Sequence, residues 1–164
     1  MMSRSSLRAM YLFIAAVVIV LDRLTKIYIE RNIELDFGTV MVIRNFFSIT
    51  HVENGGAAFS LFADWPAQVR VPLLVGFSLV AMCVVCYFLW TSPRRFTWSG
   101  LALALILGGA VGNLYDRICF GHVTDFLHFH IGLHSWPDFN LADCSICCGA
   151  VLLAADLIFW RKDA

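Results

Sequence analysis

The chain has 164 residues, of which 60% are hydrophobic and only 15% are charged, and its mean hydropathy is +0.76. A soluble domain of this length normally carries about 25% charged residues, so the composition argues against an ordinary soluble protein. The 12 basic and 12 acidic residues cancel, so the net charge gives no indication of a nucleic-acid partner.

Four apolar segments reach or approach the roughly 20 residues that a helix needs to cross a bilayer. Backbone polar groups in lipid must be satisfied within the segment, so we expect each one to be a helix. The first could be a signal peptide, but no small-residue cleavage site follows it, so we expect a retained span. The predicted spans are residues 10–29, 71–90, 98–115 and 141–160. Because they lie close together, we expect one polytopic membrane domain, residues 1–164.

Basic residues are distributed unevenly around these spans. The two termini and the link between the second and third spans hold six basic residues and one acid. The other two links, residues 30–70 and 116–140, hold four basic residues and eight acids. Lys and Arg are enriched on the cytoplasmic side of membrane proteins. We therefore expect both termini in the cytoplasm and the two acidic links on the outside.

The first outward link contains two short runs rich in β-branched and aromatic residues, 40–43 and 46–52. Such runs, bounded by glycine and asparagine, predict a pair of strands. Trp65 and Trp136, each next to a proline, suit the aromatic belt at a membrane interface. The predicted fold is therefore an all-α membrane protein with four transmembrane helices and a small extracytoplasmic β-sheet in the first outward link.

Polar residues that are costly in a membrane gather at the outer ends of the predicted spans. Intramembrane charge usually marks a functional site, and independent accidents would scatter such residues between both ends of the spans. The residues are Asp22 and Lys26 in the first span, Asn113, Asp116 and Arg117 at the third, Asp125 in the second outward link, and Asn140 and Asp143 at the fourth.

Several of these residues also have a purely structural interpretation. Asp22 can pair with Lys26, one helical turn away, or with Arg23, and so secure a helix end. Asp116 and Arg117 can form an ion pair at the membrane interface. Asp143 can stabilise the N-terminus of its helix through the helix dipole.

Two other aspartates are expected to be structural only, Asp138 as a solvated loop residue and Asp156 as a partner of Arg161 or Lys162. Asp125 differs from them, because it lies in an apolar stretch without a basic neighbour in the sequence. A carboxylate in such a stretch requires a specific partner, so Asp125 is the stronger candidate for function.

The third span contains glycines at 108, 109 and 112. Small residues on successive turns let transmembrane helices approach closely, so they predict tight packing first. They could also leave room for a substrate beside Asn113.

The cysteines and histidines suggest two other classes of function, a thiol-redox protein and a metal protein or transporter. Cys83 and Cys86 form a C-x-x-C, but they lie in the middle of the second span, where cysteine commonly acts as a small hydrophobe. The spacing of the histidines matches no closed zinc pattern. These histidines are His122, His128, His130 and His134.

Five stretches of the sequence resemble the lipoprotein signal peptidase family of bacteria, also called signal peptidase II. They are DRLTK at 22–26, NGGAAFS at 54–60, GGAVGNLYDR at 108–117, VTDF at 123–126 and FNLAD at 139–143. They occur in the order of the family and extend from the first span to the last. Thr124 stands where a second valine is common, and Cys144 stands where serine or alanine is usual.

The resemblance implies an aspartic endopeptidase that cleaves signal peptides from diacylglyceryl-modified prolipoproteins, just before the lipidated cysteine. It implies a multi-pass protein of the bacterial inner membrane that acts at the outer face, needs no metal or other cofactor, and is inhibited by globomycin. Membrane lipids are expected partners, and a monomer is expected. The catalytic aspartates of the family fall on Asp125 and Asp143. The positions expected to bind substrate or support the two aspartates are Asp22, Lys26, Asn54, Gly56, Asn113, Arg117 and Asn140.

The implied chemistry requires one carboxylate and one carboxylic acid. The carboxylate takes a proton from water, and the acid polarises the scissile carbonyl. Two close carboxyl groups in a site of low dielectric separate their titrations, because both cannot ionise cheaply. The apparent pKa values belong to the pair, so neither Asp125 nor Asp143 is assigned a fixed role.

Overall fold

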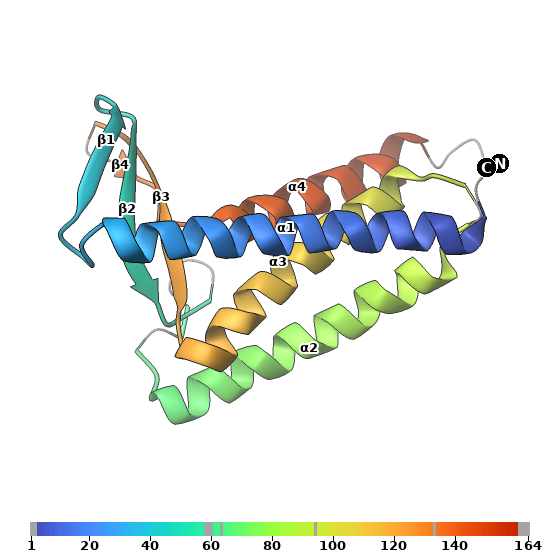
Figure 1. Ribbon diagram of the computed structural model, residues 1–164, viewed down its shortest axis with the longest axis horizontal. Helices are drawn as coiled ribbons and strands as arrows, with labels where there is room; N and C mark the ends of the chain where they lie inside the picture. The colour runs from blue at the N-terminus through green and yellow to red at the C-terminus, as the bar shows by residue number, and fades with distance from the viewer. Residues whose placement is uncertain (1–2, 58–60, 63, 94, 133, 161–164) are drawn as a thin grey trace.

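The computed structural model describes residues 3–57, 61–62, 64–93, 95–132 and 134–160. Within them, four long helices lie alongside one another and a small sheet stands across one end (Figure 1). The helices are α1 (Arg4–Asn32), α2 (Ala67–Thr91), α3 (Trp98–Phe120) and α4 (Leu141–Ala155), and the π-helical segment η2 (Asp156–Trp160) continues α4. Helices α1 and α3 run toward the sheet, whereas α2 and α4 run away from it (Figure 1).

Three of the described helices are long and apolar enough to cross a membrane: α2, α3 and the α4–η2 segment Leu141–Phe159. Helix α1, which contains the first predicted span, is 29 residues long. It is less apolar than the other three, because Asp22, Arg23 and Lys26 lie in its second half. The chain is thus mostly helical, with three candidate membrane helices and one helix that carries charge at the sheet end.

Helix α3 lies at the centre of the bundle. In its most apolar stretch 56% of the residues are buried, against 17% in α2 and in α4–η2. Its glycines make this possible: a Cβ atom on Gly108 would lie 2.7 Å from the side chain of Val18 in α1. A Cβ on Gly109 would overlap the carbonyl oxygen of Ala142 in α4. The packing role predicted for these glycines is confirmed.

The ends of α3 are defined by local hydrogen bonds. The side chain of Thr97 accepts a hydrogen bond of 3.0 Å from the backbone N–H of Gly100 and caps the start. At the other end Gly121 adopts a left-handed conformation with φ of 79°, which favours glycine. The helix continues to Phe120, beyond residue 115 where the predicted third span ends, so Asp116 and Arg117 lie within the helix.

The sheet has four antiparallel strands in the order β1-β2-β3-β4. Strands β1 (Thr39–Ile43) and β2 (Phe47–Asn54) confirm the two predicted strands. The sheet is not confined to the first outward link, however, because β3 (Val123–Ile131) and β4 (His134–Ser135) come from the second. β3 pairs with β2, and this pairing brings the two links together over the ends of the helices.

Candidate active site

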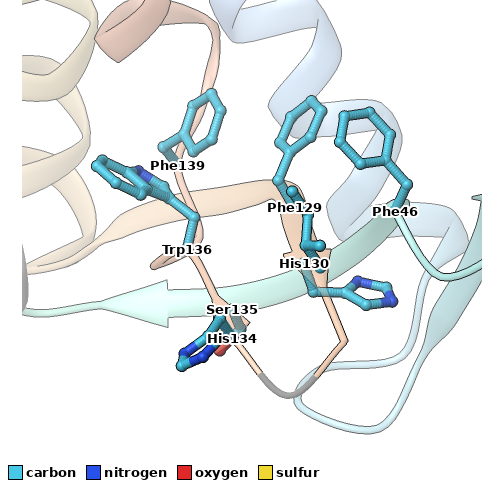
Figure 2. Close-up of a pocket in the computed structure, with 8 residues that line it drawn as sticks. Phe46, Phe129, His130, His134, Ser135, Trp136 and Phe139 are labelled. Carbon is cyan, nitrogen blue, oxygen red and sulfur yellow. The ribbon is translucent and has the colours of Figure 1, made fainter.

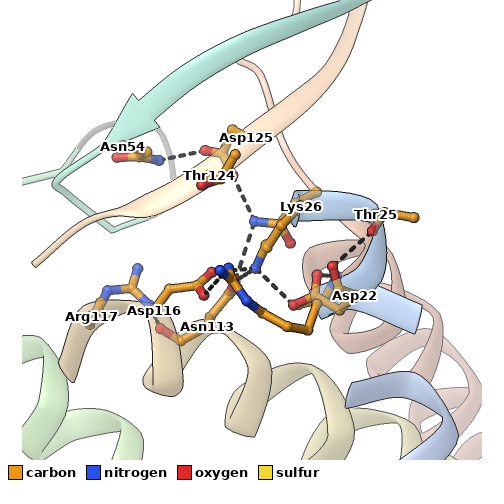
Figure 3. Close-up of polar contacts among 12 residues, drawn as sticks. Asp22, Thr25, Lys26, Asn54, Asn113, Asp116, Arg117, Thr124 and Asp125 are labelled. Atoms are coloured by element: carbon orange, nitrogen blue, oxygen red, sulfur yellow. Dashed lines mark hydrogen bonds and ion pairs between the residues drawn. The ribbon is translucent and has the colours of Figure 1, made fainter. Parts of the chain in front are cut away.

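The predicted polar residues meet where the sheet lies against the ends of α1, α3 and α4. Figure 3 shows Asp22 and Lys26 of α1, Asn113 of α3, and Asn54 and Asp125 of the sheet around one small region. Apart from Asp22 and Lys26, which are one helical turn apart, these residues are distant from one another in the sequence, so the fold itself assembles the site.

Asp125 lies in β3 and is 2% exposed. Its two carboxylate oxygens accept hydrogen bonds from different amides, Oδ2 from Asn54 Nδ2 at 2.9 Å and Oδ1 from Asn140 Nδ2 at 2.6 Å. The strand register explains the first bond, because Val52 of β2 pairs with Asp125 and Asn54 pairs with Val123. The specific partner that the sequence required for Asp125 is therefore a pair of asparagines.

Asp143 lies in the first turn of α4 and is partly exposed. Its Oδ1 accepts a hydrogen bond of 2.8 Å from Asn113 Nδ2, and its Oδ2 accepts one of 3.3 Å from the backbone N–H of Asn140. In return, Asn140 Oδ1 accepts from the backbone N–H of Asp143 at 3.0 Å. This reciprocal arrangement is a capping box, which satisfies donors at the start of the helix.

Asn140 connects the two aspartates. It is fully buried at 0% exposed, and its side-chain amide donates to Asp125 Oδ1 and to Asn113 Oδ1, the latter at 3.2 Å. Its side-chain Oδ1 accepts from the backbone N–H of Asp143 and so caps the helix α4. One side chain therefore fixes the carboxylate of the strand against the first turn of the helix.

The pKa of Asp125 is raised to about 7 from an ordinary value of 3.8. Burial is the largest cause, because a carboxylate loses its hydration in the protein interior. The negative charge of Asp143 raises the pKa of Asp125 further, while the hydrogen bonds from Asn54 and Asn140 oppose the rise. Asp125 can therefore hold a proton near neutral pH, as the acid partner in general acid–base catalysis must.

Lys26 is the centre of a buried ion network behind the two aspartates. Its Nζ lies 2.8 Å from Asp22 Oδ2, 2.7 Å from Asp116 Oδ2 and 3.0 Å from Asn113 Oδ1, and the side chain is 0% exposed. Asn113 also donates to Asp143, so one asparagine connects the network to the candidate catalytic dyad, Asp125 and Asp143. A buried lysine needs such partners, because an unpaired ammonium group in the interior is costly.

Asp22 also joins the network to α4. Its Oδ1 accepts a hydrogen bond of 3.0 Å from the backbone N–H of Ala142. Gly112 permits this contact, because a Cβ at that position would lie 2.6 Å from Asp22 Oδ2. The pairing of Asp22 with Lys26 that the sequence allowed is thus observed, but it extends to α3 and α4.

Arg117 fixes the loop that follows β2. Its guanidinium donates to the carbonyl oxygen of Gly56 at 3.0 Å and to that of Asn113 at 3.3 Å. The N–H of Gly56 donates to Asn54 Oδ1 at 2.9 Å, which orients the amide that contacts Asp125. Residues 58–60 of the same sequence stretch lie outside the described residues.

Asp116 is the main residue that the sequence interpretation undervalued. It does not pair with Arg117: its carboxylate contacts Lys26 at 2.7 Å and Arg23 at 3.4 Å. The sequence spacing could have indicated this role for Asp116, because Asn113 and Asp116 are three residues apart and therefore share a helix face. The partner on α1 could not be read from the sequence.

Asp138 and Asp156, the two aspartates expected to be structural only, are both hydrogen-bonded to side chains. Asp138 was predicted to be solvated, which was wrong: its side chain is 18% exposed and its Oδ1 lies 2.5 Å from His128 Nδ1. Asp156 accepts a hydrogen bond from the hydroxyl of Ser99. Arg161 and Lys162, its expected partners, lie outside the described residues.

The histidines and cysteines belong to several different elements of the fold. His122 contacts Glu53 at 3.0 Å, whereas His128 contacts Asp138. Among the described residues, no group of three His, Cys, Asp or Glu side chains is arranged to hold a metal ion. All six cysteines are described and are free thiols, and Cys83 and Cys86 are exposed on α2.

Comparison with known proteins gives a consistent result. A family model described as signal peptidase (SPase) II matches residues 14–159. A curated lipoprotein signal peptidase of Francisella tularensis subsp. tularensis (strain SCHU S4 / Schu 4) is 41% identical over 152 residues, 93% of each chain. One from Pseudomonas putida is 41% identical over 156 residues, 94% of this chain and 90% of that one.

Two solved structures of a bacterial membrane enzyme, determined by the in meso method, are similar in fold. Their TM-scores are 0.80 and 0.81, with sequence identities of 26% and 27%. The alignments cover 95% of this chain in both cases, and 94% and 95% of the solved chains. The similarity therefore extends over nearly the whole chain, including the helices and strands that meet at the site.

Proposed function

Because the chain belongs to the signal peptidase II family, we propose that it is an aspartic endopeptidase that cleaves signal peptides from diacylglyceryl-modified prolipoproteins. Cleavage falls just before the lipidated cysteine. Membership of this family already supports a membrane protease that cleaves lipoprotein signal peptides. The observation that carries the finer proposal is that Asn140 joins the buried Asp125 to the first turn of α4, where Asp143 lies.

In the proposed mechanism, Asp125 and Asp143 act on one water molecule and one peptide bond. The ionised partner takes a proton from the water, and the protonated partner donates a hydrogen bond to the scissile carbonyl oxygen. The raised pKa of Asp125, about 7, supports a pair that holds one proton near neutral pH. The titration belongs to the pair, so the roles are not divided between the two residues.

The remaining site residues orient this pair. Asn54 and Asn140 hold the carboxylate of Asp125, and Asn113 holds that of Asp143. Lys26 and its partner Asp22 fix Asn113 from behind. Gly56 and Arg117 set the loop beside Asn54, where a substrate backbone could lie.

The position of the site suits a lipid-anchored substrate. In this proposal the whole chain is one polytopic domain of the inner membrane, with α1 as a fourth span and both termini in the cytoplasm. The sheet then lies at the outer surface, where exposed Trp65 and Trp136 suit the aromatic belt. The acyl chains of the substrate remain in the bilayer while the scissile bond lies at headgroup depth. A monomer acts alone, and globomycin inhibits it.

The first experiment tests the two aspartates. The variants Asp125→Asn and Asp143→Asn, reconstituted with a diacylglyceryl-modified precursor, should each lose cleavage by at least about 100-fold, the contribution expected of a general acid or base. Asp64→Asn is the matched control, because Asp64 is exposed in the loop before α2. It should cleave normally. All three variants should insert into the membrane in equal amounts.

Near-normal cleavage by either dyad variant would refute the proposed mechanism. Loss of cleavage in the Asp64→Asn control would show that the assay responds to surface charge rather than to the dyad.

A further inference from the structure

The chain segment before α4 runs alongside β3, the strand that carries Asp125. The backbone N–H of Trp136 donates to the carbonyl oxygen of Phe129 at 2.8 Å. Further along, the N–H groups of Phe126 and Leu127 donate to the carbonyl oxygen of Phe139 at 3.0 and 2.8 Å. The segment then passes directly into Asn140 and the first turn of α4. It therefore determines where Asp143 lies relative to Asp125.

The backbone pairing of this segment is interrupted. Between Trp136 and Phe139 stands Pro137, which has no N–H to donate. Phe139 and Leu127 form only an isolated bridge rather than part of a ladder. The segment is therefore held to β3 at Trp136 and at Phe139, whereas Pro137 and Asp138 between these points make no backbone hydrogen bond to β3 among the described residues.

A side-chain pair attaches the stretch between these two points to β3. His128 Nδ1 lies 2.5 Å from Asp138 Oδ1, and the two side chains are 27% and 18% exposed. His128 follows Asp125 by three residues, and Asp138 precedes Asn140 by two. Hydrogen bonds to a charged group are among the stronger ones in proteins. The pair therefore joins the strand of one aspartate to the segment that leads to the other.

The opposite side of the same segment is closed by aromatic contact. The rings of Phe129 and Phe139 stack with centroids 5.8 Å apart and planes 14° apart. Together with Trp136 they line a pocket of about 440 Å³ (Figure 2). His128 and Asp138 line a different pocket, on the polar face of the sheet. The segment is thus held on two sides, by ring stacking and by the histidine–aspartate pair.

We propose that His128 and Asp138 are positioning residues for the peptidase reaction: their contact sets the distance and angle between Asp125 and Asp143. This inference rests on the proposed function. The pair touches neither carboxylate of the dyad, so it acts through the segment that ends at Asn140. Removing it should leave substrate binding intact and misplace the dyad, and a small misplacement of reacting groups lowers the turnover rate strongly.

The test uses His128→Leu, Asp138→Leu and the double variant in the full-length protein, with a diacylglyceryl-modified precursor as substrate. Each single variant should lower kcat about tenfold while KM stays within about twofold. The double variant should lose about tenfold as well, rather than about a hundredfold, because all three variants remove one shared interaction. His128→Asn should keep at least about half of the parent kcat, because its amide can donate from the position of Nδ1.

His122→Leu is the matched control. It also removes a histidine–carboxylate contact, that with Glu53 at 3.0 Å, and His122 is 28% exposed. This contact ties the turn before β3 to β2 and does not involve the segment before α4. Because the dyad keeps its geometry, kcat should stay within about twofold of the parent. Thermal unfolding should show similar losses of Tm for His122→Leu and His128→Leu. Equal stability with unequal kcat distinguishes positioning from a merely structural role.

A kcat within twofold of the parent in both single leucine variants would overturn the inference and leave the proposed function standing. A kcat of His128→Asn as low as that of His128→Leu would overturn it too, even if the leucine variants fold poorly. Absence of cleavage by the unmodified protein would instead overturn the proposed function, and the inference with it.

Discussion

Asp125 experiences two opposing influences in the folded chain. Burial and the charge of Asp143 disfavour its ionised form, while the amides of Asn54 and Asn140 favour it. The balance leaves its pKa at about 7. Neutral amides can orient a carboxylate without neutralising it, whereas a lysine or arginine in the same place would lower the pKa and remove the proton. Asparagine partners therefore suit the proposed role of Asp125, in which its carboxyl group exchanges a proton during each turnover.

The raised pKa predicts how stability depends on pH. In the unfolded chain Asp125 loses its proton near pH 3.8, but in the folded chain it keeps it to about pH 7. Stability from this group is therefore fully present below pH 3.8 and is lost as the pH rises to about 7. Each pH unit between the unfolded and folded pKa values of Asp125 changes the free energy of unfolding by about 1.4 kcal/mol.

The Asp125→Asn variant has no carboxyl group to titrate at this position. Its free energy of unfolding relative to that of the parent should therefore rise between about pH 5 and about pH 8, by on the order of 2–3 kcal/mol. Tm measured in detergent at several pH values would test this. A difference between variant and parent that stays constant over that range would contradict it.

The identity of most site residues was evident from the sequence, whereas their partners were not. Asp125, Asn140 and Asp143 attract attention because polar side chains in apolar surroundings are costly. Asp116 and Asp138 were assigned ordinary roles, because their partners Lys26 and His128 are separated from them in the chain. An ion pair across two helices, or across a strand and a loop, depends on packing that the local sequence does not encode.

Among the elements, α3 controls the spacing of the site through its glycines. Gly109 faces the backbone of α4 at Ala142, one residue before Asp143. Gly112 faces Asp22 of α1. Helix association in a membrane depends on close packing rather than on hydrophobic driving force, so these positions tolerate no extra atom. The same glycines therefore set the distance between helices and the positions of the side chains they carry.

Gly109→Ala tests this dependence. The added methyl group must push α4 away from α3, so the variant should lose about 1–3 kcal/mol of stability and most of its cleavage activity. Gly76→Ala is the matched control, because Gly76 also lies in a helix but a Cβ there meets nothing within 4 Å. It should be neutral or slightly stabilising. Normal Tm and activity in Gly109→Ala would show that the helices can separate at no cost.

At the level of elements, the helices were easier to predict than the sheet. Long apolar runs specify helices directly, although α3 extends to Phe120, beyond its predicted end at residue 115. The strands β1 and β2 were recognised from their β-branched residues. Strand β3 was missed as a partner of β2, because antiparallel pairing between two separate links depends on where the helix ends bring them.

Taken as a whole, the molecule carries its polar machinery at one end and an apolar surface along its length. The start of α1 and the end of η2 lie together at the end away from the sheet (Figure 1). The helices expose large apolar side chains such as Phe77, Tyr87 and Val151. Such an exterior suits lipid tails, and it predicts that the sheet and the two helix ends lie on opposite sides of the bilayer.

This orientation can be tested by cysteine labelling. All six native cysteines are first replaced by serine, which should preserve cleavage because none of them contacts Asp125 or Asp143 by hydrogen bond in the described chain. In this background Thr39→Cys, in exposed β1, should react with a membrane-impermeant maleimide in intact spheroplasts. Arg95→Cys, in the exposed link before α3, should react only after permeabilisation. The reverse labelling pattern would show that the sheet faces the cytoplasm and would contradict the predicted orientation.

Asn140 both caps α4 and holds Asp125, and this has a consequence for inhibitors and for the mutants that resist them. A compound that hydrogen-bonds this side chain would contact a group that also caps α4 and holds Asp125. Replacement by a residue other than aspartate, serine or threonine removes the helix cap, at about 1 kcal/mol. Those three residues lack the amide that donates to Asp125, the proposed catalytic carboxyl group. Resistant enzymes selected against such a compound should therefore carry their changes elsewhere, and position 140 should remain asparagine among the survivors.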